Sequence, residues 1–225
     1  MSKTYFVTGT DTEVGKTAIA CALLEAANQR GLQTAAVKPV AAGCDEQGRN
    51  EDALQLQQSM SMTLTYEQVN PVALQAAIAP HIAAAEEGRT LQAGRLAGLC
   101  RGVMLVGADL VLVEGAGGWR VPLGPRETLA DLAVQLQVEV ILVVGMRLGC
   151  INHALLTAEA IARDGLHLAG WVANQPAERM RNHEENLDTL VRKLPAPLLG
   201  EVAHLQPFSP QEAAQHLDID RLYSK

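Results

Sequence analysis

A glycine-lysine-threonine triplet at the start of a predicted helix constrains this chain more than any other feature. The segment GTDTEVGKT, residues 9–17, follows a short β-prone run at residues 4–8. Its last three residues, Gly15, Lys16 and Thr17, fit the end of a phosphate-binding loop, where backbone N–H groups and the helix dipole favour phosphate oxygens. We therefore expect Lys16 to reach the phosphates of a nucleotide and the Thr17 hydroxyl to bind Mg²⁺.

The spacing within this segment departs from the usual phosphate-loop pattern. In that pattern four residues separate a first glycine from the Gly-Lys-Thr triplet. In this chain the first glycine would then stand at position 10. Position 10 is Thr10, and the nearest glycine is Gly9, one residue earlier. The extra residue predicts a slightly wider loop that brings Glu13 near the phosphates or the metal.

Composition limits the class of protein. The chain has 225 residues, of which 48% are hydrophobic and 19% are charged, as in ordinary globular proteins. Its net charge of −7 gives no basic surface for nucleic acid, so we expect no nucleic-acid partner. No signal peptide precedes the first predicted strand and no apolar run has membrane-spanning length, which predicts a cytoplasmic protein with no membrane partner. Reduced thiols are the better interpretation of the scattered cysteines Cys21, Cys44, Cys100 and Cys150.

Strand-like and helix-like stretches alternate along the chain. The apolar runs lack alternation, which predicts strands covered on both faces. The sequence therefore favours the α/β class: a three-layer fold with a mostly parallel sheet flanked by helices, similar to P-loop NTPases, in a single domain over residues 1–225. Residues 61–90 are the least legible. We predict strands at 4–8, 34–40, within 109–118, at 138–145 and at 166–174, and helices at 16–30, 51–60, 91–108, 128–137, 151–164 and 177–193.

Ligands of such sheets bind beyond the carboxyl ends of the strands, so residues that follow strands are informative. Lys38 could neutralise a transferring phosphoryl group or an anionic substrate, but a surface lysine at a strand end is an equally good interpretation. Glu114 ends a buried strand before the glycine-rich turn 115–118 and resembles an acidic metal-organising position. Asp52, at a predicted helix start, is a weaker third candidate, because acidic residues are ordinary there.

Two further segments allow a functional and a purely structural interpretation. Asn174 closes a strand, and its amide could pair with a nucleobase edge, although an Asn in a turn is the better interpretation of that residue alone. Residues 148–156 place a helix N-terminus after a strand, which could bind an anion or be an ordinary capped helix start. The six histidines show no metal spacing, and no nucleophilic triad is visible.

Taken together, several segments resemble the dethiobiotin synthetase family. They are GTDTEVGKT, KPVAAG, RNEDAL, VEGAGGW, LGCINHALLTAEAI, GWVAN and PAPLLGE, and they are spread over essentially the whole chain. The resemblance implies ATP-dependent carboxylation and ring closure of 7,8-diaminononanoate with carbon dioxide, giving dethiobiotin, ADP and phosphate. It further implies a carbamate and a carbamic-phosphoric mixed anhydride as intermediates, with ATP as cosubstrate and Mg²⁺ as cofactor. It also implies a homodimer whose active site lies at the subunit interface.

Roles carry over to the matching positions of this chain. Lys38 and Lys16 are the catalytic residues that the resemblance implies, and Thr17, Asp52 and Glu114 are the metal ligands. Substrate-binding residues are Thr12, Lys38, Ala42, Gly149, Cys150, Ile151 and Asn152, the last four capping the carboxylate tail of a substrate held mainly by the other subunit. The ATP site comprises Glu13, Val14, Gly15, Lys16, Thr17, Ala18, Asp52, Glu114, Gly115, Ala116, Gly117, Asn174, Gln175, Ala203, His204 and Leu205.

The chain departs from the family pattern at two places. Ala42 stands where the family often has a small hydroxyl residue, and Ala203-His204 replaces a stretch that is frequently rich in proline.

Two other classes of protein compete with the interpretation as a dethiobiotin synthetase. Amidoligases of corrin-ring amidation need a glutaminase domain for which 225 residues leave no room. Partitioning ATPases carry a second lysine early in the loop, where this chain has Thr10.

Overall fold

The computed structural model describes residues 2–223, and its centre is a parallel β-sheet. Within these residues six strands form one sheet in the order β2-β5-β1-β6-β7-β8, and every neighbouring pair is parallel. The prediction of a mostly parallel sheet is thereby confirmed. The strands are β1 (Lys3–Gly9), β2 (Thr34–Val37), β5 (Leu110–Glu114), β6 (Glu139–Gly145), β7 (Leu168–Asn174) and β8 (Leu198–Val202).

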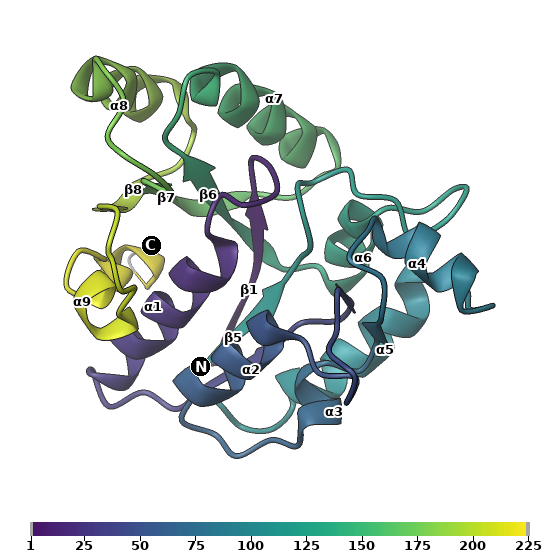
Figure 1. Cartoon of the computed structure of the whole chain (residues 1–225). Coiled ribbons are helices and arrows are strands. Elements are labelled where there is room, and N and C mark those ends of the chain that lie inside the picture. The colour runs from purple at the N-terminus through teal and green to yellow at the C-terminus, as the bar shows by residue number, and fades with distance from the viewer. Residues whose placement is uncertain (1, 224–225) are drawn as a thin grey trace.

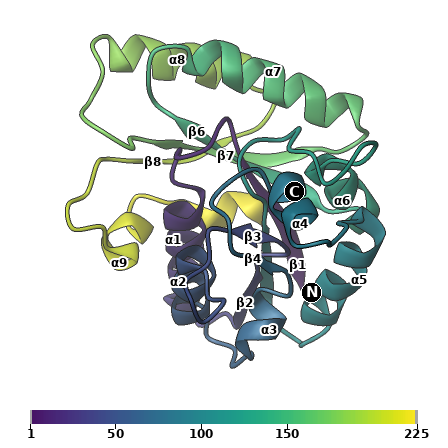
Figure 2. The same cartoon turned by 45° about the vertical axis from the view of Figure 1, so that its right-hand side comes forward.

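Helices cover both faces of this sheet, as Figures 1 and 2 show. The chain moves one way along the sheet from β1 to β2 and the other way in later crossovers, and right-handed connections then place the helices on opposite faces. The helices are α1 (Lys16–Asn28), α2 (Glu51–Ser59), α3 (Tyr66–Val69), α4 (Pro80–Glu86), α5 (Ala93–Met104), α6 (Leu129–Leu136), α7 (Cys150–Arg163), α8 (His183–Lys193), α9 (Pro210–Ala214) and the 3₁₀ helix η1 (Ile219–Leu222).

Neighbouring residues of the central strands pack against different helices. Leu142 and Trp171 belong to the cluster that α7 and α8 complete, whereas Val143 and Val172 belong to the main core with α1. Both faces are therefore apolar, which explains why the strand sequences show continuous apolar runs instead of alternation. No helix among the described residues is both long and apolar enough to cross a lipid bilayer.

Several predicted boundaries differ from the structure, and two of the differences have a local reason. Helix α8 begins at His183 instead of residue 177, because Asn182 has a left-handed backbone (φ 57°) and Pro176 breaks the segment before it. Helix α5 is shorter at both ends than the predicted 91–108. Strand β2 stops at Val37, since the next residue pairs outside the sheet: the Lys38 N–H donates to Val69 O.

Residues 61–90, whose secondary structure was not clear from the sequence, form short elements that complete one wall of the site. Strand β4 (Ala73–Leu74) pairs in parallel with β3 (Ala41–Ala42), and Gly43 N–H donates to Ala76 O at 3.1 Å. Elements of two residues carry no periodicity, so their pattern cannot be read from sequence. The pairing holds residues 41–44 against residues 73–77.

The unusual position of the first loop glycine has a packing reason. Val14, at the tip of the loop, is fully buried. A Cβ on Gly9 would lie 2.6 Å from Val14 Cγ2, and one on Gly145 would lie 2.7 Å from Val14 Cγ1. The ends of β1 and β6 therefore lack side chains where Val14 packs between them. The wider loop is anchored by an apolar contact that needs glycine at position 9.

This packing predicts that Gly145→Ala is destabilising. The added methyl group overpacks the Val14 contact, which typically costs about 1–3 kcal/mol in a packed core. Gly98→Ala, on the exposed side of α5, is the matched control, because nothing lies within 4 Å of the added Cβ. It should be neutral or stabilising by up to about 1 kcal/mol. Urea unfolding of the three proteins measures both effects, and equal midpoints for Gly145→Ala and wild type would contradict the packing account.

Candidate active site

The phosphate loop is held in place by an asparagine from the end of β7. Asn174 Nδ2 donates to Val14 O at 2.8 Å, and Asn174 is 6% exposed. Gly15 has φ 84°, and a Cβ on it would overlap the same amide nitrogen. Only glycine combines this left-handed backbone with so close an approach. Lys16 Nζ is turned back within the loop, where it donates to Asp11 O at 3.0 Å.

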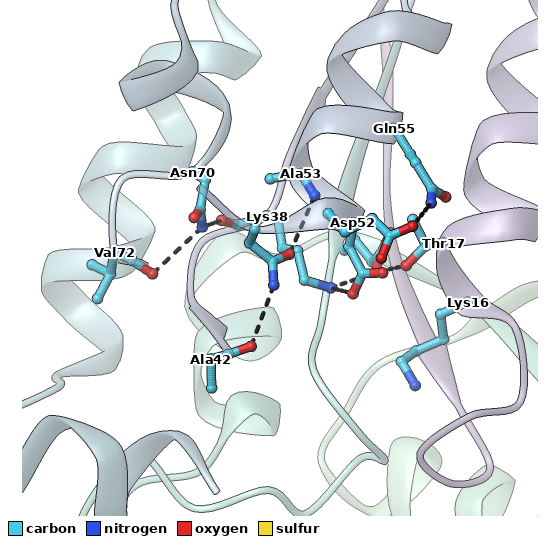
Figure 3. Close-up of polar contacts among 12 residues, drawn as sticks. Lys16, Thr17, Lys38, Ala42, Asp52, Ala53, Gln55, Asn70 and Val72 are labelled. Carbon is cyan, nitrogen blue, oxygen red and sulfur yellow. Dashed lines mark hydrogen bonds and ion pairs between the residues drawn. The ribbon is translucent and has the colours of Figure 1, made fainter. Parts of the chain in front are cut away.

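A buried carboxylate joins the loop to the end of β2. Glu114 Oε1 accepts hydrogen bonds from Thr17 Oγ1 at 2.8 Å and from Lys38 Nζ at 2.6 Å. Lys38 Nζ also lies 2.9 Å from Asp52 Oδ2. Figure 3 shows Thr17, Lys38 and Asp52 pointing toward one another, from α1, from the end of β2 and from α2. The structure thus brings together three sequence-predicted groups with Lys38, which is a buried lysine and not a surface one.

The charges of this cluster stabilise one another. Burial alone would lower the pKa of Lys38, but the Glu114 and Asp52 carboxylates outweigh it and raise that pKa above its ordinary value. Burial likewise opposes the ionised form of Asp52, and Lys38 outweighs it, so the pKa of Asp52 lies below its usual range. Lys16 differs, because burial dominates the pull of Glu114 and lowers the pKa of Lys16 to about 8.

Two asparagines that the sequence did not single out position this cluster. Asn70 Nδ2 donates to Lys38 O at 2.8 Å, which fixes the backbone of the lysine (Figure 3). Asn50 is the N-cap of α2, where its side chain accepts from Ala53 N–H, and its Nδ2 donates to Ala42 O at 3.3 Å. The only sequence signal for Asn50 was its place before a predicted helix, a position where asparagine is favoured.

A cavity of about 740 Å³ opens beside the cluster. Its polar side chains gather at the loop and include Thr12, Glu13, Lys16 and Thr17. Much of the remaining lining is apolar. This apolar wall consists of Ala41, Ala42, Ala77, Ile78, Ala79, Pro80 and Val121, together with Ala116 and Gly117. Residues 77–80 were missed at the sequence level, because they lie in the illegible segment.

The donor set fits Mg²⁺ bound together with a nucleotide. Glu114 Oε2 is buried and has no hydrogen-bond partner among the described residues, so one carboxylate oxygen is available as a ligand. Thr17 and Asp52 add a hydroxyl and a second carboxylate nearby. No cluster of three or more His, Cys, Asp or Glu side chains suited to a metal occurs in residues 2–223. Few protein ligands are typical of Mg²⁺, which keeps waters and phosphate oxygens in its shell.

The two residues predicted for the adenine site have different partners. Asn174 points to the loop, whereas Gln175, just after the end of β7, donates from Nε2 to Glu201 Oε1 at 2.7 Å, beside the buried His183 of α8. Residues 203–205 follow β8 next to this strand end, since Gln175 N–H donates to Val202 O.

The segment predicted to cap the substrate tail lies apart from the cavity lining. Gly149 is the N-cap of α7 with φ 96°, and no side chain caps this helix. Leu148, just before it, is 95% exposed. Arg147 in the same turn forms an ion pair with Asp11 of the phosphate loop, so this turn is linked to the loop within the subunit.

Fold and loop together define a P-loop NTPase. Solved structures with the same fold include a ParA family ATPase from Chlorobium tepidum, with a TM-score of 0.58 and 11% identity over all of both chains. MinD from Pyrococcus horikoshii gives 0.56 and 15%, covering 99% of this chain and 90% of its own. FtsY from Elizabethkingia anophelis gives 0.58 and 13%, and this chain spans 64% of its length. At such identities the similarity shows the fold alone.

Relatives found by sequence identify the family, whereas the solved structures show only the fold. The ATP-dependent dethiobiotin synthetase of Cellvibrio japonicus is 60% identical over 98% of this chain and 97% of its own length. The corresponding Pseudomonas aeruginosa protein is 60% identical over 96% of both chains, and one from Escherichia coli O157:H7 is 52% identical over 95% of this chain and 96% of its own. A family model described as an AAA domain matches residues 3–212.

The chain belongs to the ATP-dependent dethiobiotin synthetase family. It is therefore an enzyme, an ATP-dependent ligase, as the sequence motifs predicted. The two competing classes, corrin amidoligases and partitioning ATPases, are not supported at this level of identity. The ParA and MinD structures share the fold without sharing the sequence.

The lowered pKa of Lys16 predicts a pH dependence of ATP binding. Above about pH 8 the free protein has lost the Lys16 proton, and the triphosphate favours its return. ATP affinity should therefore be constant below about pH 8 and fall above it, with proton uptake on binding. Calorimetry in buffers of different ionisation enthalpy measures this uptake. Lys16→Arg should lose the pH dependence, since arginine stays charged. Proton release by the wild type would contradict the assignment.

Proposed function

We propose that the protein forms dethiobiotin from 7,8-diaminononanoate, carbon dioxide and ATP, releasing ADP and phosphate, through a carbamate and a carbamic-phosphoric mixed anhydride. One observation carries this proposal. A single cavity is lined both by two lysines, Lys16 and Lys38, and by an apolar wall. A substrate with an anionic reacting group and a methylene chain matches both kinds of lining.

The two lysines of the cavity suit a reaction between two anions. The carbamate must approach the γ-phosphate, and the ammonium groups of Lys16 and Lys38 can reduce the repulsion between them. Bound Mg²⁺ would neutralise further charge on the phosphates, held by Thr17, Asp52 and Glu114. The remaining loop residues, from Glu13 to Ala18, supply backbone N–H groups for the phosphate oxygens.

The apolar wall of the cavity suits the hydrocarbon chain of the substrate. Burial of methylene groups against apolar side chains is favourable by roughly 0.8 kcal/mol for each group. Ala42 and Thr12 line the cavity where the substrate is expected, and Ala42 offers no hydroxyl. A substrate hydrogen bond at this position would come from water or from backbone.

Ring closure needs no covalent enzyme nucleophile. Phosphate is a good leaving group in the mixed anhydride, and the second amine of the same molecule lies near it, so proximity favours the cyclic urea. The buried thiols are unsuited to attack, because burial raises the pKa of both Cys21 and Cys100 to about 12. We propose that Asn174 and Gln175 form the adenine site, with residues 203–205 on its edge.

We further propose a cytoplasmic homodimer with the active site at the subunit interface. The turn before α7 supports this, because Leu148 is exposed and no side chain caps the backbone N–H groups at the helix start formed by Gly149, Cys150, Ile151 and Asn152. In a dimer these groups would cap the carboxylate tail of the substrate bound to the other subunit. The exposed Leu156 of α7 and Ile78 of the cavity wall are further apolar groups that an interface would cover.

The reaction is tested with purified protein. Incubation with 7,8-diaminononanoate, bicarbonate and MgATP should release ADP only when the diamine is present, and mass spectrometry should detect dethiobiotin. ATP hydrolysis at the same rate without the diamine would contradict a ligase reaction on this substrate.

The role of Lys38 predicts a loss of turnover on its removal. Lys38→Ala should lower kcat by about 10²–10³-fold, the range seen when a group that stabilises transition-state charge is lost. Lys193→Ala, at the exposed end of α8, is the control lysine and should leave turnover unchanged. Full activity of Lys38→Ala would refute the assignment.

A further inference from the structure

We propose that the Lys38 ammonium occupies the cation position of the metal site in the nucleotide-free protein, so that metal binding displaces Lys38 toward the reacting anions. The inference rests on the proposed function for the identity of the metal site. It adds an exchange between two cations on one set of oxygen atoms. Lys38 would be kept away from the substrate until the metal and the nucleotide arrive.

The first support is the geometry of the ammonium group. Lys38 Nζ lies 2.6 Å from Glu114 Oε1 and 2.9 Å from Asp52 Oδ2. The same Glu114 oxygen accepts from Thr17 Oγ1 at 2.8 Å. Two of the oxygens proposed as metal ligands, Glu114 Oε1 and Asp52 Oδ2, therefore contact the Lys38 ammonium. The third, Thr17 Oγ1, bonds to Glu114 Oε1, and Figure 3 shows Thr17, Lys38 and Asp52 together.

The second support is burial. The Glu114 side chain is 0% exposed and that of Lys38 is 5% exposed, so neither charge is hydrated by bulk water. A buried carboxylate without a cation is costly, which means that some cation must remain beside Glu114. Lys16 does not serve this purpose, because its Nζ is directed to the carbonyl oxygen of Asp11.

The third support is charge balance. The cluster contains two lysines, Lys16 and Lys38, and two carboxylates, Asp52 and Glu114, so its formal charge is zero. A divalent cation added alone would create an excess of positive charge in a buried site. A metal that arrives with the triphosphate brings enough negative charge to avoid this excess, and it can then replace Lys38 on the carboxylates. The second oxygen of Glu114, which has no hydrogen-bond partner among the described residues, remains available to the metal.

The exchange predicts that removal of Lys38 exposes a metal site in the absence of nucleotide. Mn²⁺ is the probe, and free Mn²⁺ is counted by electron paramagnetic resonance during titration of nucleotide-free protein. Lys38→Met should bind Mn²⁺ at least about tenfold more tightly than wild type, because the competing ammonium at the ligand oxygens is gone. Lys38→Arg keeps a cation there and should bind as weakly as wild type.

Lys16→Met tests whether tighter Mn²⁺ binding comes from removal of the ammonium on the carboxylates or from any loss of positive charge in the cavity. It removes one positive charge from the same cavity but leaves Lys38 on the carboxylates, so Mn²⁺ affinity should rise much less than in Lys38→Met. Equal tightening in Lys16→Met and Lys38→Met would overturn the proposal, as would no tightening in Lys38→Met. A wild type that makes dethiobiotin while Lys38→Met fails this test would refute the exchange and leave the proposed reaction standing.

Thermal unfolding keeps the test decisive if Lys38→Met is too unstable for titration. The variant leaves Glu114 and Asp52 without their lysine, and Mn²⁺ should compensate for that loss. Addition of Mn²⁺ without nucleotide should therefore raise the Tm of Lys38→Met more than that of wild type. An equal or smaller rise in the variant would contradict the exchange.

Discussion

The site depends on one buried carboxylate. Glu114 Oε1 bonds both the Thr17 hydroxyl at the start of α1 and the Lys38 ammonium at the end of β2, and Lys38 in turn pairs with Asp52 of α2. A charge with no exposed surface must be compensated by its neighbours. The phosphate loop, the lysine proposed to be catalytic and the proposed metal ligands are therefore held by a single electrostatic network at the carboxyl edge of the sheet.

The loop itself is held by packing and by one amide. Val14 fills the space that Gly9 and Gly145 leave open, and Asn174 bonds the Val14 carbonyl. These contacts connect the loop to β1, β6 and β7 independently of any ligand. The loop is thus preorganised for phosphate, while Lys16 and Lys38 both bond to protein oxygens in the free protein. We therefore expect ligand binding to move these lysine side chains.

Sequence reasoning predicted the fold class and singled out Lys16, Thr17 and Glu114, because a phosphate-loop triplet and a carboxylate after a buried strand are local signals. It left Lys38 open between a functional and a surface role. It could not predict the apolar wall at residues 77–80. That wall depends on a parallel pairing of two-residue strands, which has no periodicity. Nor could it separate Asn174 from Gln175, since the direction of a side chain at a strand end depends on register.

The most direct test of the central claim is a crystal structure with Mg²⁺ and a non-hydrolysable ATP analogue. It locates the cation on Glu114 and the position of the Lys38 ammonium in one experiment. The account predicts a metal ion held by Glu114, Asp52 and Thr17, with Lys38 Nζ moved from the two carboxylates toward the terminal phosphate. A complex in which Lys38 still bridges Glu114 and Asp52, while the metal ion binds elsewhere, would contradict it.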